Sequence, residues 1–361
     1  MDKRFSDIIG LILLSRNKAI RAVNVELINL YWNVGAYIKQ KLTTTDWGDK
    51  TVSELANFIQ ENNPEIRGFS RAGLYRMIQF YESYAGTKFV ASMRRQIHSN
   101  DIQENIITPT TLKQIEQEDI RDSILVQLSW THHRTIFSRC KIIEEREFYI
   151  RMSISENYTV RELDRQISAS LFERTMIGNV QLSPQIKEMQ IGITNTFKDN
   201  YVLEFLNLPE SFSESDLEKG IIAQMKNFIL ELGKDFLFVD QQYKIQVGNS
   251  DFYIDLLFYH RGLQCLVAFE LKADKFKPEH LGQLNFYLEA LDRDVKKSNE
   301  NPSIGILLCK DKDFEVVEYA LSRSLSPTMV AEYQLKLPDK KLLEQKLHEL
   351  FENSSRFSRE L

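Results

Sequence analysis

Two apolar, strand-like runs that carry acids constrain this chain more than any other feature. The stretch IDLLFYHRGLQCLVAFELKAD, residues 254–274, reads as two strands joined by a tight turn at residues 260–262. Asp255 and Glu270 lie inside these runs. A buried carboxylate costs several kcal/mol unless it is paired, hydrogen-bonded or bound to a metal. Any fold of this chain must therefore compensate both acids.

The second half of the chain is predicted to form an α+β domain. A helix with one apolar face precedes the two strands, and further helices and strands follow them in alternation. The expected order is αβββαβ with additions at the end. The ranges are a helix at 214–232, strands at 236–240, 242–247, 251–259 and 263–272, a helix at 279–291, a strand at 303–309, a helix at 314–321 and a strand near 330–335.

The first half is predicted to be all-α, because long stretches have apolar residues at helical spacing and little Gly or Pro. We place the helical domain at 1–177, a linker of mixed polarity at 175–192 and the α+β domain at 193–361. The chain is thus an α+β protein of two domains, long enough for each to have its own core.

A helix-turn-helix-like pattern lies in the helical domain. One helix starts near Val52, the chain breaks between residues 63 and 68, and a second helix starts after the capping residue Ser70. This second helix would present three polar side chains to nucleic acid, as a recognition helix does. They are Arg71, Arg76 and Gln79. The alternative is a plain helical hairpin with a solvated basic face.

Charge and cysteine usage limit the class of protein. The net charge is -5, yet residues 67–95 contain six basic residues and one acid, Glu82, so a local basic patch is expected. The three cysteines are far apart and in no metal-binding spacing, which indicates a reducing compartment. The apolar run at 8–14 is too short to span a bilayer. We therefore expect a cytoplasmic protein with no membrane segment.

Strand alternation places Glu270 and Lys272 on one face of their strand. If the partner strand brings Asp255 beside them, two carboxylates and an ammonium converge. Carboxylate oxygens suit Mg²⁺, which often takes only one or two of them from the protein. The alternative is surface ion pairing, of Asp255 with Lys244 or Lys272 and of Glu270 with Lys272, which contributes little.

This pattern resembles the PD-(D/E)XK nuclease superfamily, whose αβββαβ core carries an Asp on the second strand and (D/E)-x-K on the third. The matching segments are FYIDLLFY with Asp255 and AFELKAD with Glu270 and Lys272. Ile254 stands where a Pro often precedes the Asp.

Two further elements extend the resemblance. Glu218 lies on the preceding helix, where many members have an additional acidic ligand, and GQLNFYL places Gln283 four residues before Tyr287, as in a Q-x-x-x-Y element. With the N-terminal segments GFSRAGLYRMIQFYESY and LSWTHHR, the chain is similar to the YhcG-like nuclease family over nearly its full length.

The resemblance implies a restriction-endonuclease-like domain that hydrolyses phosphodiester bonds with Mg²⁺ or Mn²⁺, most often as an endonuclease on DNA. Its metal ligands would be Glu218, Asp255 and Glu270; Lys272 would orient water or stabilise charge, and Gln283 and Tyr287 would orient these groups. The alternatives are an RNA nuclease and an inactive nucleic-acid-binding or assembly subunit. Nucleic acid is the expected partner, with a homodimer for cutting duplexes and protein partners for the helical domain.

Overall fold

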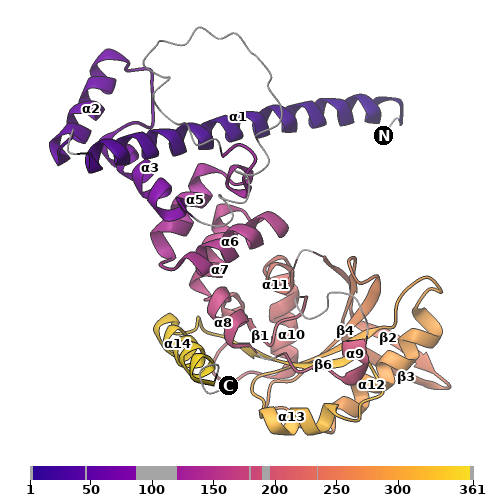
Figure 1. Ribbon diagram of the computed structural model, residues 1–361. Coiled ribbons are helices and arrows are strands. Elements are labelled where there is room, and N and C mark those ends of the chain that lie inside the picture. The colour runs from indigo at the N-terminus through magenta and orange to yellow at the C-terminus, as the bar shows by residue number, and fades with distance from the viewer. Residues whose placement is uncertain are drawn as a thin grey trace. The chain divides into compact units, whose positions relative to one another are not determined.

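The computed structural model describes residues 3–44, 47–86, 120–178, 180–188, 196–233 and 235–357. The chain divides into two compact units, Met1–Asp164 and Arg165–Leu361 (Figure 1). The sequence-based limits had placed residues 165–177 in the helical domain, whereas here they group with the C-terminal unit. Part of the expected basic patch, from residue 87 to Arg95, lies outside the described residues, as does part of the linker.

The N-terminal unit is helical in its described residues, which confirms the predicted fold class. Trp32 is fully buried, and an idealised Cβ on Gly35 of α1 would lie 2.1 Å from the carbonyl oxygen of Met77 in α3, so the two helices touch closely. None of the described helices is both long and apolar enough to cross a bilayer. The helices are α1 (Lys3–Thr43), α2 (Asp49–Asn62), α3 (Arg71–Tyr84), η2 (Ile124–Gln127), α5 (Trp130–Arg139), α6 (Ile143–Ser155) and α7 (Val160–Ser168).

Helices α2 and α3 form the predicted pair with a break at residues 63–70. Ser70 caps α3, because its hydroxyl accepts the N–H of Gly73 at 3.3 Å. One face of α3 is buried, and the opposite face exposes the three predicted contact residues. These are Arg71, Arg76 and Gln79. Arg71 lies over the ring of the half-exposed Tyr75, at 5.8 Å from its centroid.

The C-terminal unit is built on one six-stranded sheet in the order β1-β6-β5-β4-β3-β2. Strands β2, β3 and β4 are antiparallel, and β4, β5, β6 and β1 run parallel to one another. The predicted αβββαβ order is confirmed. The strands are β1 (Asn200–Val202), β2 (Phe236–Val247), β3 (Ser250–His260), β4 (Cys265–Leu271), β5 (Ile304–Cys309) and β6 (Thr328–Gln334).

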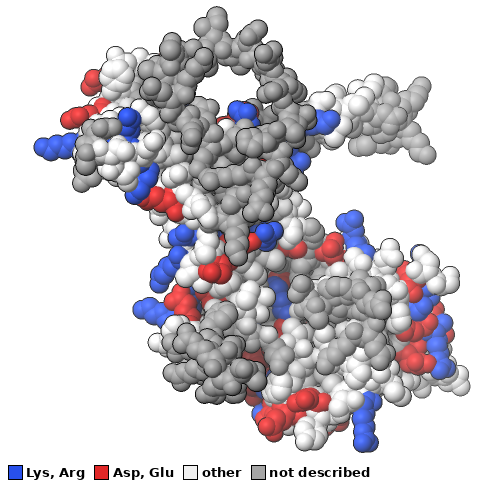
Figure 2. All heavy atoms as spheres, viewed as in Figure 1, with Lys and Arg blue, Asp and Glu red and all other residues white. Residues whose placement is uncertain are grey.

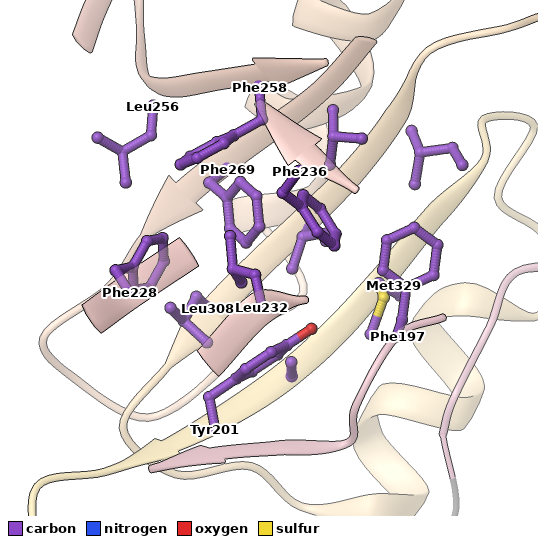
Figure 3. Close-up of a cluster of buried hydrophobic side chains, with 14 of the residues drawn as sticks. Phe197, Tyr201, Phe228, Leu232, Phe236, Leu256, Phe258, Phe269, Leu308 and Met329 are labelled. Carbon is purple, nitrogen blue, oxygen red and sulfur yellow. The ribbon is translucent and has the colours of Figure 1, made fainter. Parts of the chain in front are cut away.

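Helices cover both faces of this sheet (Figure 1). The core with α10 and α11 contains four aromatic rings that pack edge to face or tilted, Phe228, Phe236, Phe258 and Phe269 (Figure 3). The opposite core packs α12 and α13 on the sheet. The helices are α8 (Leu171–Ile177), α9 (Pro184–Glu188), η4 (Glu204–Leu206), α10 (Glu214–Ala223), α11 (Met225–Leu232), α12 (His280–Ala290), η5 (Leu291–Val295), α13 (Phe314–Leu321) and α14 (Lys340–Phe357).

Strand β1 is not among the predicted strands, and the helix at 214–232 and strands β2 and β4 depart from their predicted ranges. The helix expected at 214–232 is broken at Gln224, which separates α10 from α11. Strand β2 is continuous, with an irregularity between Phe238 and Asp240, where two runs were expected. Strand β4 starts later than expected because Gln264 adopts a left-handed conformation (φ +51°) in the turn before it.

A buried carboxylate, Glu231 of α11, joins several parts of this unit. It accepts hydrogen bonds from the guanidinium of Arg165 at 2.8 Å and from the N–H of Val202 at 3.2 Å. Arg174 and Lys198 also lie within 3.4 Å of it. Burial raises the pKa of Glu231, but Lys198, Arg174 and Arg165 outweigh burial and lower this pKa to about 2. These contacts connect residues 165–177 to the sheet domain.

Candidate active site

The predicted acids meet where strands β3 and β4 separate. The β3·β4 ladder ends at the pair Leu256 and Phe269. Beyond it, the Asp255 Oδ2 accepts the backbone N–H of Leu271 at 2.8 Å, in place of a ladder partner. Asp255 is thus fixed at the opening of the sheet, where helices α10 and α12 both approach β4.

Glu270 and Lys272 lie on the same face of β4, as strand alternation predicted. The Lys272 ammonium donates to Glu270 Oε1 at 2.9 Å and to Glu214 Oε2 at 3.3 Å. The Glu270 side chain is only 2% exposed. Its second oxygen, Oε2, is buried and has no hydrogen-bond partner among the described residues. One oxygen of this buried carboxylate is therefore not compensated by a hydrogen bond from the described residues.

Burial and charge shift the pKa values at this site in consistent directions. Burial and the neighbouring Asp255 raise the pKa of Glu270 to about 7, although Lys272 opposes this shift. Burial also raises the pKa of Asp255, against the Leu271 N–H and Lys272. Burial alone would lower the pKa of Lys272, but Glu270 and Glu214 outweigh it and raise this pKa. The site thus combines two carboxyl groups whose pKa values are raised with a lysine whose raised pKa keeps it positively charged.

The three acids on α10 have different positions. Glu218 is half-buried and shares a hydrogen-bond donor with Asp255, while Glu214 reaches Lys272. Asp216 instead accepts from Ser213 in the capping box that starts the helix. Among the described residues, no three side chains of the His, Cys, Asp or Glu type are grouped closely enough to hold a metal. Glu218 as a metal ligand stays a prediction.

The shared donor is Gln242 of β2, which the sequence analysis did not select. Its Nε2 lies 3.0 Å from Glu218 Oε2 and 3.2 Å from Asp255 Oδ1. The available signal was the polar triplet Asp240-Gln241-Gln242, which interrupts an otherwise β-rich run. This signal does not single out Gln242, because the register of β2 on β3 decides which residue of the triplet lies next to Asp255.

The predicted Q-x-x-x-Y pair also lies next to the acids. Gln283 donates to the Tyr287 hydroxyl at 2.6 Å on one face of α12. Burial raises the pKa of Tyr287, and Glu270 and Asp255 add to this increase. Tyr287 is therefore within electrostatic range of both carboxylates and remains a neutral donor. The residues predicted to contact nucleic acid, Arg71, Arg76 and Gln79, belong to the other unit.

Comparison with known proteins identifies the family of this chain. The YhcG PDDEXK nuclease domain matches residues 194–348, and the DUF1016 N-terminal domain matches residues 7–174. The YhcG protein of Escherichia coli (strain K12) is 30% identical over 358 residues, which is 94% of this chain and 92% of that protein. The chain belongs to the YhcG family of PDDEXK nuclease-domain proteins.

Two solved structures share a more limited likeness. They are a repair endonuclease from Pyrococcus abyssi (TM-score 0.24) and the structure of an EndoMS–dsDNA2 complex (TM-score 0.25), each 16% identical in sequence. The alignments cover 36% and 37% of this chain and 50% and 48% of those chains. The matched part thus spans about half the length of each.

In this YhcG-family site, the residues present suit a divalent cation. Asp255 and Glu270 carry carboxylate oxygens, which are the ligand atoms that hard divalent cations prefer, and Glu270 Oε2 has no hydrogen-bond partner among the described residues. A cation there would offset the burial that raises the pKa of both acids. Which cation binds is part of the proposal below.

Proposed function

We propose that the chain is a divalent-metal-dependent nuclease that cuts phosphodiester bonds in DNA as an endonuclease. The observation that supports this most is the buried Glu270 with one unpartnered oxygen, set between Asp255 and Lys272 at the opening of the sheet. Membership of the YhcG family supports the same reaction class. The proposed cation is Mg²⁺ or Mn²⁺, because both take carboxylate oxygens.

In the proposed reaction, water adds to phosphorus, the P–O bond to one sugar oxygen breaks, and that oxygen takes up a proton. Asp255 and Glu270 would hold the cation, with Glu218 as the third acid, and the bound cation would neutralise the scissile phosphate and acidify a water ligand. Lys272, held at 2.9 Å from Glu270, would orient the attacking water and stabilise negative charge on the phosphate.

The helix α12 pair has a supporting part in this proposal. Tyr287 stays protonated because its pKa is raised, so it can donate a hydrogen bond to a phosphate oxygen or to water near the acids. Gln283, which holds the Tyr287 hydroxyl at 2.6 Å, would fix its direction.

We propose that α3 of the N-terminal unit contacts the DNA. Among the described residues of the C-terminal unit, basic and acidic side chains are interspersed on the face seen in Figure 2, and acids gather at α13. Exposed Arg71, Arg76 and Gln79, with Tyr75 beside Arg71, instead supply charge, hydrogen bonds and a ring on one helix.

We further propose that the chain acts as a homodimer in the cytoplasm and binds protein partners. A single cluster of this kind cuts one strand at a time, so cleavage of both strands of a duplex would favour a homodimer. Other protein partners would bind through the helical unit. The three cysteines are buried and far apart in the chain, which suits a reducing compartment, and we propose the cytoplasm.

The test is cleavage by the purified chain of circular DNA, linear DNA and RNA of the same sequence, with Mg²⁺, Mn²⁺ or a chelator. We expect Asp255→Asn to lose metal-dependent cleavage and metal binding together. Lys272→Ala and Lys272→Met should lose at least roughly a hundredfold in turnover while metal binding is kept. If the chain cleaves RNA and not DNA, the proposed substrate changes from DNA to RNA. Absence of cleavage with intact nucleic-acid binding would favour a binding subunit.

A further inference from the structure

Gln242 occupies an unusual backbone position in the middle of strand β2. Its φ is +46°, a left-handed conformation that residues other than Gly, Asn and Asp adopt at a cost. Its neighbours Gln241 and Tyr243 pair regularly with Leu256 and Ile254 of β3. The left-handed residue thus lies between two regular pairs, next to Asp255 of β3, and such local strain is typical of functional positions.

The distorted backbone allows one side chain to serve two acids. The Gln242 amide nitrogen has two N–H donors, and it lies 3.0 Å from Glu218 Oε2 and 3.2 Å from Asp255 Oδ1. Glu218 comes from helix α10 and Asp255 from strand β3, so Gln242 connects two elements that no ladder joins. Without these donors, the carboxylates of Glu218 and Asp255 would lose the hydrogen-bond donor that they share, and their mutual repulsion would remain.

Gln242 also completes the hydrogen bonding of Asp255. One Asp255 oxygen accepts the Leu271 N–H at 2.8 Å, and the other accepts from Gln242. Both oxygens are therefore oriented before any cation arrives. The Gln242 side chain itself is exposed.

We propose that Gln242 is a positioning residue that holds Glu218 beside Asp255 and thereby sets the affinity of the site for its divalent cation. This inference rests on the proposed metal-dependent nuclease. Its role is to align ligands, as the hydrogen-bond partners of metal ligands commonly do, and removal of such a partner typically costs about 10- to 100-fold in metal affinity.

The experiment separates the side chain from the backbone strain. Gln242→Ala removes the amide and keeps an unfavourable residue at positive φ, whereas Gln242→Gly removes the amide and relieves the strain. We expect the same loss of Mn²⁺ affinity, about tenfold or more, in both variants of the full chain without nucleic acid, measured by calorimetry. Gln242→Gly should have a higher Tm than Gln242→Ala. The matched control is Gln241→Ala, an exposed neighbour in regular strand conformation.

Cleavage kinetics provide a second readout. Because Gln242 acts through the cation, we expect its variants to need more Mn²⁺ for half-maximal rate and to approach the wild-type rate at saturating Mn²⁺. Mn²⁺ affinity within twofold of wild type in both variants, while Asp255→Asn no longer binds, would overturn the role of Gln242 alone. A wild-type chain that binds no Mn²⁺ would overturn this role and the metal-dependent reaction together.

Discussion

Replacing Glu270 by Gln should stabilise the metal-free protein at alkaline pH, which is the opposite of what loss of an ion pair normally does. Glu270 is 2% exposed, and its pKa is raised from 4.5 to about 7. This difference corresponds to a penalty on the order of 3 kcal/mol for keeping the carboxylate charged in the folded state. Gln has the same shape and no charge, so it removes the penalty and can still accept from Lys272.

The effect has a defined pH dependence. A carboxyl whose folded pKa is raised binds its proton more tightly in the folded state, so the wild-type protein loses stability as pH rises from about 4.5 through about 7. Glu270→Gln lacks the titrating carboxyl, so its stability does not fall in this way as the pH rises. The two proteins should therefore have similar Tm below pH 4.5, and at about pH 8.5 the variant should melt on the order of 5 to 10 °C higher.

The assay is thermal unfolding in a chelator across this pH range, followed by addition of Mn²⁺. Wild type should gain stability from Mn²⁺ by mass action, and Glu270→Gln should gain little. Glu318→Gln on the exposed face of α13 is the control for removing an acid without burial. An equal loss of Tm at every pH in Glu270→Gln would refute the reasoning and show that Glu270 mainly serves as an ion-pair partner of Lys272.

Two further predictions concern the recognition helix and the buried Glu231 cluster. The double variant Arg71→Ala, Arg76→Ala should weaken DNA binding and lower the salt dependence of binding without changing Mn²⁺ affinity. The control is a variant that removes two exposed arginines elsewhere. An unchanged salt dependence in the double variant contradicts DNA contact by α3. Glu231→Gln should lower stability by about 3–5 kcal/mol in urea unfolding at neutral pH, because three partly buried cations lose the charge of the buried acid that they share. Since the pKa of Glu231 is lowered to about 2, this stability should be present above about pH 4.5 and disappear as pH falls through 2, and an unchanged urea midpoint contradicts it.

Local periodicity made several features of this protein predictable. A strand repeats every two residues, so Glu270 and Lys272 had to share a face, and Lys272 Nζ lies 2.9 Å from Glu270 Oε1. A helix repeats every 3.6 residues, so Gln283 and Tyr287 had to be neighbours, and they are hydrogen-bonded. The start of α3 after Ser70 followed from capping chemistry, which also acts within one turn.

Contacts between distant elements were decided only by the tertiary structure. Glu214 and Glu218 are equivalent acids in the sequence, yet one reaches Lys272 and the other reaches Gln242, because α10 packs on the sheet in one orientation. Gln242 joins the site only because the β2·β3 register places it next to Asp255. Glu231 reads as an ordinary helix residue, but the fold surrounds it with three cations. Periodicity is set by a residue's neighbours in the chain, so the sequence alone determined which side chains share a face. Register and packing depend on the whole sheet, so only the tertiary structure decided which distant residues meet.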